Sequence, residues 1–409
     1  MSIEQGLNGI TGPEGAENQP HSSIVQSAPG AGERTLLVAS DGANGRALWI
    51  SDGTAEGTYL LKVIAPGFEW AQIGGFVQLG NKVLFYAEDG EHGVELWVTD
   101  GTGAGTVMLK DIQAGGGSSG PDSFTRLGNK LLFSAYNDAN GNELWVTDGT
   151  AEGTVMLKDI EGGSVSSGPH SFTRLGDKLL FSANTDTNGS ELWVTDGTAE
   201  GTVMLKDIQA GGGSSEPSNF TPLRDTLLFS AYTDANGREL WVTDGTEAGT
   251  ILLKDIQAGS DWSDPHSFTR LGDKLLFSAY TGANGYELWV TDGTETGTVM
   301  LKDILAGSGS SSAHSFTQLG NKLLFSAYTD TNGWELWVTD GTGSGTVMLK
   351  DIRAGSGGSH PYSFTQLGNK LLFAAQTDTN GRELWVTDGT EAGTVMLKDI
   401  WAGGDSSYP

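Results

Sequence analysis

The chain repeats one segment eight times at a fixed interval, and this repetition constrains its fold more than any other feature. Residues 335–342 read ELWVTDGT, and every copy continues as Asp-Gly-Thr-x-x-Gly-Thr into a short apolar segment. A regular period of this size, 48 residues from Trp337 to Trp385, is typical of solenoids and propellers. The repeated tryptophans are Trp49, Trp97, Trp145, Trp193, Trp241, Trp289, Trp337 and Trp385.

Each copy predicts four β-strands, here named A to D. In the last copy they are residues 363–367, 370–376, 383–387 and 394–400, which are rich in β-branched, aromatic and apolar side chains. The Gly-Asn and Asn-Gly pairs between them are turn signals, so A to D are expected to be antiparallel neighbours. Only the linker after strand D is long enough to begin a new sheet. The sequence therefore predicts an all-β fold, an eight-bladed β-propeller with four antiparallel strands per 48-residue blade.

Composition narrows the classes of partner. The formal charge of −28 disfavours nucleic acid and anionic membranes. No apolar run approaches the roughly 20 residues needed to cross a bilayer, so membrane insertion is not expected. The absence of cysteine excludes disulfides and thiolate metal sites.

Two segments are expected along the chain. Residues 1–19 are polar, glycine-rich and unrelated to the repeat, and are predicted to be a mobile N-terminal extension. Residues 20–409 are predicted to form a single propeller. No secretory signal is visible at the N-terminus. An extracellular or cell-surface location would therefore require another export route, or the chain would be an excised fragment.

The repeated motif resembles that of the bacterial ELWxxDGTxxGT repeat proteins. The resemblance covers residues 47–400, and the first copy departs from it with Ala47 in place of glutamate. The predicted strand order is also similar to that of kelch blades. The resemblance implies a module of a large surface or secreted bacterial protein. It implies no established chemistry, so function has to be argued from the site.

Differences between the copies gather on one predicted face. The B–C turns and D–A linkers lie on this face, whereas the nearly invariant A–B and C–D turns lie on the other. Exposed aromatic side chains there suggest stacking against sugar rings, with neutral variation of exposed loops as the alternative. Three histidines at one repeat position, His170, His266 and His314, and His360, two positions earlier in its own repeat, are interpreted as surface or turn residues. The predicted ligand-binding residues are Trp70, Trp262, Tyr286, Trp334, Tyr362 and Trp401.

Acidic residues recur on strands B, C and D. If Asn-Gly forms a two-residue turn, Asp330 lies opposite Glu335, and if Asp340 pairs with Thr346, Glu335 also lies opposite Asp351. Three carboxylates abreast would repel one another, and Ca²⁺ would relieve the repulsion. The predicted metal ligands are Asp138, Glu143, Asp159, Asp186, Glu191, Asp207, Asp234, Glu239, Asp255, Asp330, Glu335, Asp351, Asp378, Glu383 and Asp399.

Salt bridges between blades are the alternative to calcium. Lysines such as Lys62 and Lys110 recur in all eight copies and could reach the acids of a neighbouring blade. The first copy has Ala47 and Val63 and lacks both acids, which suggests that the acids act as a unit.

The function predicted from these features is a non-catalytic, multivalent module that binds carbohydrate or a cell surface through the variable face. The alternative is a structural or adhesion spacer of a secreted or surface protein, which calcium at the acidic residues would stabilise. An enzyme is disfavoured, because every candidate acid is repeated and no single nucleophile–base pair stands out.

Overall fold

The computed structural model describes residues 23–27, 34–68 and 70–409. The chain divides into two compact units, Met1–Gly120 (unit 1) and Pro121–Pro409 (unit 2). The extension predicted for residues 1–19 lies outside the described residues. No helix in the described part of the chain is long and apolar enough to cross a membrane.

Unit 1 contains two four-stranded antiparallel sheets, each with its strands in sequential order. The strands are β1 (Ser23–Ser27), β2 (Thr35–Ser40), β3 (Arg46–Ser51), β4 (Tyr59–Lys62), β5 (Ile73–Leu79), β6 (Lys82–Glu88), β7 (Val94–Thr99) and β8 (Val107–Lys110).

Unit 2 contains six sheets of the same kind. The strands are β9 (Asp122–Leu127), β10 (Lys130–Asn137), β11 (Gly141–Thr147), β12 (Val155–Lys158), β13 (His170–Leu175), β14 (Lys178–Thr185), β15 (Gly189–Thr195), β16 (Val203–Lys206), β17 (Ser218–Leu223), β18 (Thr226–Thr233), β19 (Gly237–Thr243), β20 (Ile251–Lys254), β21 (His266–Leu271), β22 (Lys274–Thr281), β23 (Gly285–Thr291), β24 (Val299–Lys302), β25 (His314–Leu319), β26 (Lys322–Thr329), β27 (Gly333–Thr339), β28 (Val347–Lys350), β29 (Tyr362–Leu367), β30 (Lys370–Thr377), β31 (Gly381–Thr387) and β32 (Val395–Lys398).

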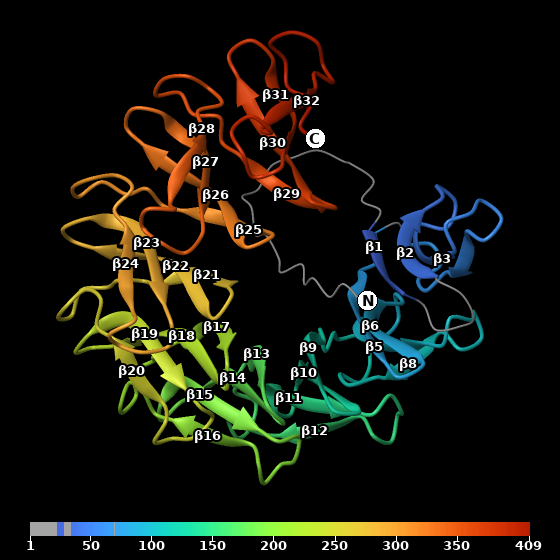
Figure 1. Ribbon diagram of the computed structural model, residues 1–409. Helices are drawn as coiled ribbons and strands as arrows, with labels where there is room; N and C mark the ends of the chain where they lie inside the picture. Colours follow the sequence, from blue (N-terminus) through green and yellow to red (C-terminus); the bar gives the residue numbers. More distant parts are fainter. Residues whose placement is uncertain (1–22, 28–33, 69) are drawn as a thin grey trace. The chain divides into compact units, whose positions relative to one another are not determined.

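These sheets confirm the prediction of an all-β chain with four antiparallel strands in each repeat. The fourth strand is shorter than expected, since β32 spans Val395–Lys398 rather than residues 394–400. In unit 2 the six sheets follow one another as blades along an arc, with the first strand of each innermost (Figure 1). Consecutive first strands contact one another, as β9 and β13 do, and then β13 and β17.

Apolar packing between consecutive sheets explains the repeated tryptophans. In unit 2, Trp193 of one sheet is buried in a cluster with Leu132 and Leu144 of the preceding sheet. Phe181 lies beside Trp193, with 6.4 Å between the ring centroids. Since each sheet presents one apolar face forward and one backward, a single repeated sequence provides both sides of every such contact. The same arrangement recurs in unit 1, where Trp97 packs with residues of both sheets.

The B–C turn differs from the prediction, and the difference changes the register of the acids. Thr329 pairs with Gly333, so three residues rather than two connect β26 to β27. Gly333 has a φ of 67°, which glycine adopts without cost. Glu335 therefore pairs with Ala327, and Asp330 lies in the connection instead of beside it.

Candidate functional site

The Asp-Gly-Thr-x-x-Gly-Thr motif forms a self-contained turn. In the seventh repeat, Asp340 Oδ1 accepts hydrogen bonds from the amide and hydroxyl of Thr342, at 2.9 and 2.7 Å. Gly345 N donates to Thr342 Oγ1 at 3.0 Å, and Thr346 Oγ1 donates to Thr342 O at 2.7 Å. The bonds from Thr342 hold the pKa of Asp340 below its ordinary value, the side-chain bond most strongly. Every fixed residue of the motif thus has a local structural role.

The repeated glutamate clamps the linker that follows its own sheet. Glu335 is fully buried on β27. Its carboxylate accepts bonds from the amides of Ile352 (2.8 Å), Arg353 (3.2 Å) and Ser359 (2.9 Å), and from Ser359 Oγ (2.7 Å). All four partners are donors, which suits an ionised carboxylate, whereas burial is the larger influence and raises the pKa of Glu335. The clamp holds the D–A linker against the blade.

The first repeat supports this interpretation by lacking the whole clamp. Ala47 replaces the glutamate, Ala71 stands where the other repeats have the clamping serine, and both alanines are buried. Val63 replaces the aspartate on strand D. In the first repeat, apolar residues therefore replace the glutamate and the serine of the clamp together.

The predicted arrangement of three carboxylates is wrong. Asp330 is in the B–C connection, whereas Asp351 Oδ2 accepts a bond from Asn332 Nδ2 at 2.9 Å. Across the described residues, no group of three acidic or histidine side chains is placed to hold a metal ion. The same displacement applies to the other predicted strand B ligands, Asp138, Asp186, Asp234 and Asp378. Calcium binding stays a prediction without the geometry that suggested it.

The alternative of lysine salt bridges is also wrong for the described residues. Leaving Asp138 aside, none of the ion pairs found there joins a strand D lysine to these acids. Lys206 Nζ instead donates to the carbonyl of Glu247 at 3.3 Å, and Lys350 Nζ donates to the carbonyl of Glu391 at 3.3 Å. These lysines contact the C–D turn of the next repeat through its backbone.

The six predicted aromatic residues do not form one kind of site. Trp70, Trp262 and Trp401 are exposed. The other three are partly buried and contact the chain's own side chains. Trp334 lies edge-on to His314 with centroids 4.9 Å apart, Tyr286 packs against Tyr280 at 5.3 Å, and Arg382 lies over Tyr362 at 5.1 Å. An equivalent cluster occurs in two consecutive repeats, as His266–Tyr286–Tyr280 and as His314–Trp334–Tyr328, but it is not repeated in all the described sheets.

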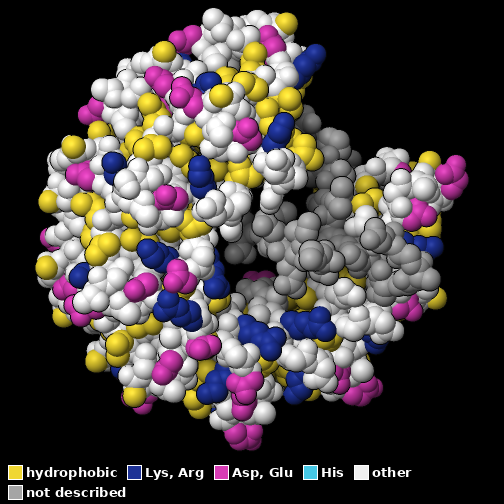
Figure 2. Space-filling model, in the orientation of Figure 1, with side chains coloured by type: hydrophobic (Ala, Val, Ile, Leu, Met, Phe, Trp, Pro, Cys, Tyr) yellow, Lys and Arg dark blue, Asp and Glu magenta, His cyan; other side chains and the backbone are white. Residues whose placement is uncertain are grey.

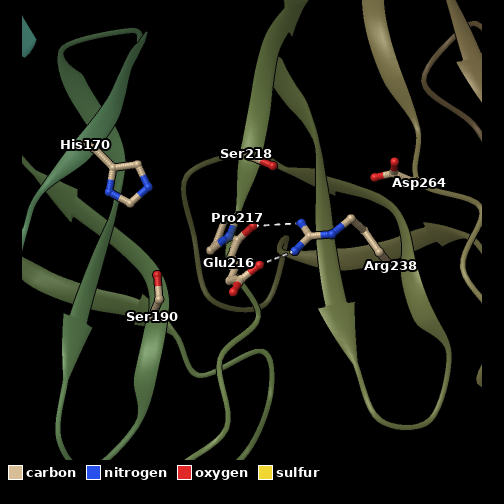
Figure 3. Close-up of a pocket in the computed structure, with 7 residues that line it drawn as sticks. All are labelled: His170, Ser190, Glu216, Pro217, Ser218, Arg238 and Asp264. Atoms are coloured by element: carbon tan, nitrogen blue, oxygen red, sulfur yellow. Dashed lines mark hydrogen bonds and ion pairs between the residues drawn. The ribbon is translucent and has the colours of Figure 1, made fainter. Parts of the chain in front are cut away.

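A pocket of about 440 Å³ opens on the variable face of unit 2, where three consecutive repeats meet. His170 and Ser190 approach it from one side, the linker before β17 forms its middle, and Arg238 and Asp264 lie on the other side (Figure 3). The lining residues are His170, Ser190, Glu216, Pro217, Ser218, Arg238 and Asp264.

Charged groups of both signs face this pocket. Arg238 has a side chain only 11% exposed, and its guanidinium donates to Glu216 Oε2 at 2.6 Å and to the Glu216 carbonyl at 2.9 Å. Tyr286 Oη donates to Asp264 Oδ2 at 3.4 Å. With Arg238 paired to Glu216, the carboxylate of Asp264 leaves the lining with a net negative charge when His170 is neutral.

From the sequence, His170 was interpreted only as a surface or turn residue, and Glu216 and Asp264 were not singled out. A comparison of the repeats contains the missing signal. Glu216 and Asp264 stand at the linker position that Gly120 and Gly168 fill in earlier repeats, and φ is positive at all four. An acidic residue at a position where earlier repeats have glycine could have identified Glu216 and Asp264 as candidate site residues.

No family model and no curated protein matches this chain. Solved structures resemble it only distantly. A puromycin hydrolase has 16% identity and a TM-score of 0.39 over 86% of this chain and 58% of its own. A puromycin-hydrolyzing peptidase of Mycobacterium tuberculosis has 12% identity and a TM-score of 0.40, over 81% of this chain and 53% of its own. A structure from a study of two prolyl endopeptidases has 12% identity and a TM-score of 0.43, over 87% of this chain and 54% of its own.

The chain spans little more than half the length of these peptidases, and likeness at this level transfers no activity to it. It does not support the predicted multivalent carbohydrate-binding module either. That prediction is wrong in its central feature, because the aromatic residues it relied on form equivalent clusters in only two of the described repeats, rather than one site in every blade. No comparison supports the alternative of an adhesion spacer.

Proposed function

We propose that this chain is a recognition module that binds a cationic side chain of a polypeptide partner in the pocket lined by Glu216, Arg238 and Asp264. The observation that carries the proposal is the placement of two acidic residues at strained backbone positions beside one pocket. The negative charge of the whole chain, −28, would also speed the approach of a basic partner.

The fold itself does not require Glu216 and Asp264, because the same left-handed position holds glycine, serine, histidine or tyrosine in other repeats. Their φ values are 46° and 42°, whereas Gly168 occupies the equivalent position at 54°. A side chain in this left-handed region costs about 1 kcal/mol relative to glycine. Such strain is concentrated at functional sites, where the side chain is needed for another reason. Here that reason is the negative charge the two residues present to the pocket.

Binding, rather than catalysis, suits the lining. Ser190 Oγ hydrogen-bonds to Ser182 Oγ at 2.9 Å, and Ser218 Oγ hydrogen-bonds to Ser230 Oγ at 3.1 Å. The Nδ1 atom of His170 lies 2.9 Å from the carbonyl of Gly168. Both serines are thus engaged with other serines and His170 with the backbone, so the lining holds no serine–histidine pair of the kind that activates a nucleophile.

The test uses Asp264→Gly and a fluorescent peptide of alternating lysine and glycine, measured by anisotropy at low salt. We expect wild type to bind the peptide and Asp264→Gly to bind it about tenfold more weakly, since a charge-assisted contact is lost. The free energy of unfolding should stay equal or rise by up to about 1 kcal/mol, because strain is relieved. Loss of binding without loss of stability is the signature of a binding residue.

Two matched variants separate the pocket from general effects. Ser312→Gly relieves the same strain one repeat further on, at a φ of 44°, and should bind the peptide as wild type does. Asp225→Asn removes one negative charge from an A–B turn and should also leave binding nearly unchanged. The proposal would be contradicted if wild type did not bind the lysine peptide. It would also be contradicted if either control variant lost as much affinity as Asp264→Gly does.

Two finer predictions accompany this function. We propose that the eight sheets close into one eight-bladed propeller, and that the chain is a member of the ELWxxDGTxxGT repeat proteins. The eight four-stranded sheets and the unbroken 48-residue period support both.

A further inference from the structure

We propose that arginines at the ends of the innermost strands of unit 2 form a docking strip for an acidic polypeptide segment. Arg126, Arg174 and Arg270 occupy the same position on β9, β13 and β21, and all three are exposed. Arg224 follows β17, the strand between β13 and β21. Because consecutive first strands contact one another, the four residues belong to four adjacent blades.

Other repeats show which part of these arginines the fold needs. Arg174 Nε and Arg270 Nε each donate to a glycine carbonyl in the adjoining A–B turn, both at 2.8 Å. In later repeats a neutral side chain makes the same bond: Gln318 Nε2 donates to Gly320 O at 3.0 Å, and Gln366 Nε2 donates to Gly368 O at 3.2 Å. Glutamine therefore fulfils the structural role, and the positive charge of the arginines is additional to it.

The ends of these guanidinium groups are available for a ligand. Among the described residues, the hydrogen bonds of Arg126, Arg174 and Arg270 involve only Nε, which leaves the terminal amino groups facing solvent. Arg224 is engaged more fully, with Asp273 at 3.4 Å, but both side chains are more than half exposed. An exposed pair of this kind is weak and exchanges readily for another carboxylate.

The strip is basic within a strongly acidic chain. Residues 126–130, 174–178, 222–226 and 270–274 include seven basic and three acidic side chains, although the formal charge of the chain is −28. Lys and Arg side chains gather along the inner margin of the unit 2 blades in the space-filling view (Figure 2). Local charge thus opposes the overall charge along this margin.

A carboxylate-bearing segment fits the strip better than a nucleic acid does. The guanidinium fork matches a carboxylate with two parallel hydrogen bonds, and successive blades offer such forks at a regular spacing. A nucleic acid carries a dense, continuous charge that the surrounding acidic surface would repel. A short acidic polypeptide can place its charge on the strip alone.

The test is the binding of a fluorescein-labelled decaglutamate peptide to the full chain, measured by anisotropy at low salt. We expect the triple variant Arg126→Gln, Arg174→Gln, Arg270→Gln to bind about tenfold more weakly than wild type, as for the loss of three exposed charge pairs. Its thermal midpoint should match that of wild type, because glutamine keeps the turn bond. Conversely, Gln318→Arg with Gln366→Arg lengthens the strip and should tighten binding severalfold.

A charge-matched control removes three lysines from strand D: Lys158→Gln, Lys254→Gln and Lys302→Gln. This variant has the same net charge as the arginine triple and should keep most of the binding. The proposal is overturned if wild type does not bind decaglutamate, or if both triples lose affinity equally. It is also overturned if a ten-nucleotide single-stranded DNA binds more tightly than the peptide.

Discussion

At the scale of single residues, near-identical repeats serve as internal controls. A residue shared by all or nearly all copies is explained by the turn or the clamp that it builds, as Asp340 and Glu335 are. A residue that departs from its equivalents, although they satisfy the same local geometry, requires another explanation. Asp264, where two earlier repeats have glycine, and Arg174, where two later repeats have glutamine, are such departures. Both proposals above rest on this comparison.

The clamp predicts a strong effect for a nearly isosteric change. Glu335→Gln places an amide donor where the carboxylate now accepts four hydrogen bonds, so at least one buried donor loses its acceptor. We expect the free energy of unfolding at pH 8 to fall by about 2 kcal/mol. Urea denaturation would measure this change. The control Glu391→Gln, in an exposed turn, should stay within about 0.5 kcal/mol of wild type, and equal effects of the two would contradict the clamp.

At the scale of elements, the C–D turn depends on its second glycine. A side chain at Gly345 would meet the carboxyl group of Asp340, which the bonds from Thr342 hold in place. Gly345→Ala should therefore cost about 2 kcal/mol of stability by overpacking, measured by thermal unfolding. Ser344→Ala is the matched control, because Ala104 and Ala248 occupy that position in other repeats. A Gly345→Ala midpoint equal to that of the control would show that the aspartate is free to move.

The elements were also where prediction from sequence succeeded and failed. The strands were predictable because eight copies repeat the same alternation of apolar residues and turn signals. The register of strands B and C was not, because the asparagine of the Asn-Gly pair does not form a two-residue turn. Asn332 instead bonds to Asp351, and the connection lengthens by one residue.

The candidate site was harder to predict than the fold. It depends on residues far apart in sequence, such as His170 at the start of β13 and Asp264 in the linker before β21, that meet only when consecutive blades pack. A search of one repeat for a motif cannot find a site that three repeats share. The glutamate clamp could have been found, because Ser359 has a serine equivalent in every repeat except the first.

At the scale of the whole molecule, repetition multiplies small electrostatic effects. Burial raises the pKa of most clamping glutamates, to about 7 at Glu239, and the directions at Glu143, Glu191 and Glu287 are the same. Glu383 is the exception: burial raises its pKa, but its hydrogen bonds together outweigh burial and lower it. The turn aspartates behave in the opposite way. Hydrogen bonds from the neighbouring threonines lower the pKa of residues such as Asp244. Since both groups recur along the chain, their separate contributions add in the pH dependence of stability.

We therefore expect stability to be greatest in mild acid. The raised glutamates bind more protons folded than unfolded, so stability falls as pH rises from 4.5 to about 7. The turn aspartates stabilise the fold when ionised, so stability also falls as pH drops through 3.8 and below. The midpoint of thermal unfolding, measured from pH 3 to 8, should be highest near pH 4 to 5. Above pH 5 it should fall less steeply in Glu239→Gln than in wild type. A midpoint that rises steadily from pH 5 to 8 would show that the glutamates are ionised without cost, and that their four donors outweigh burial.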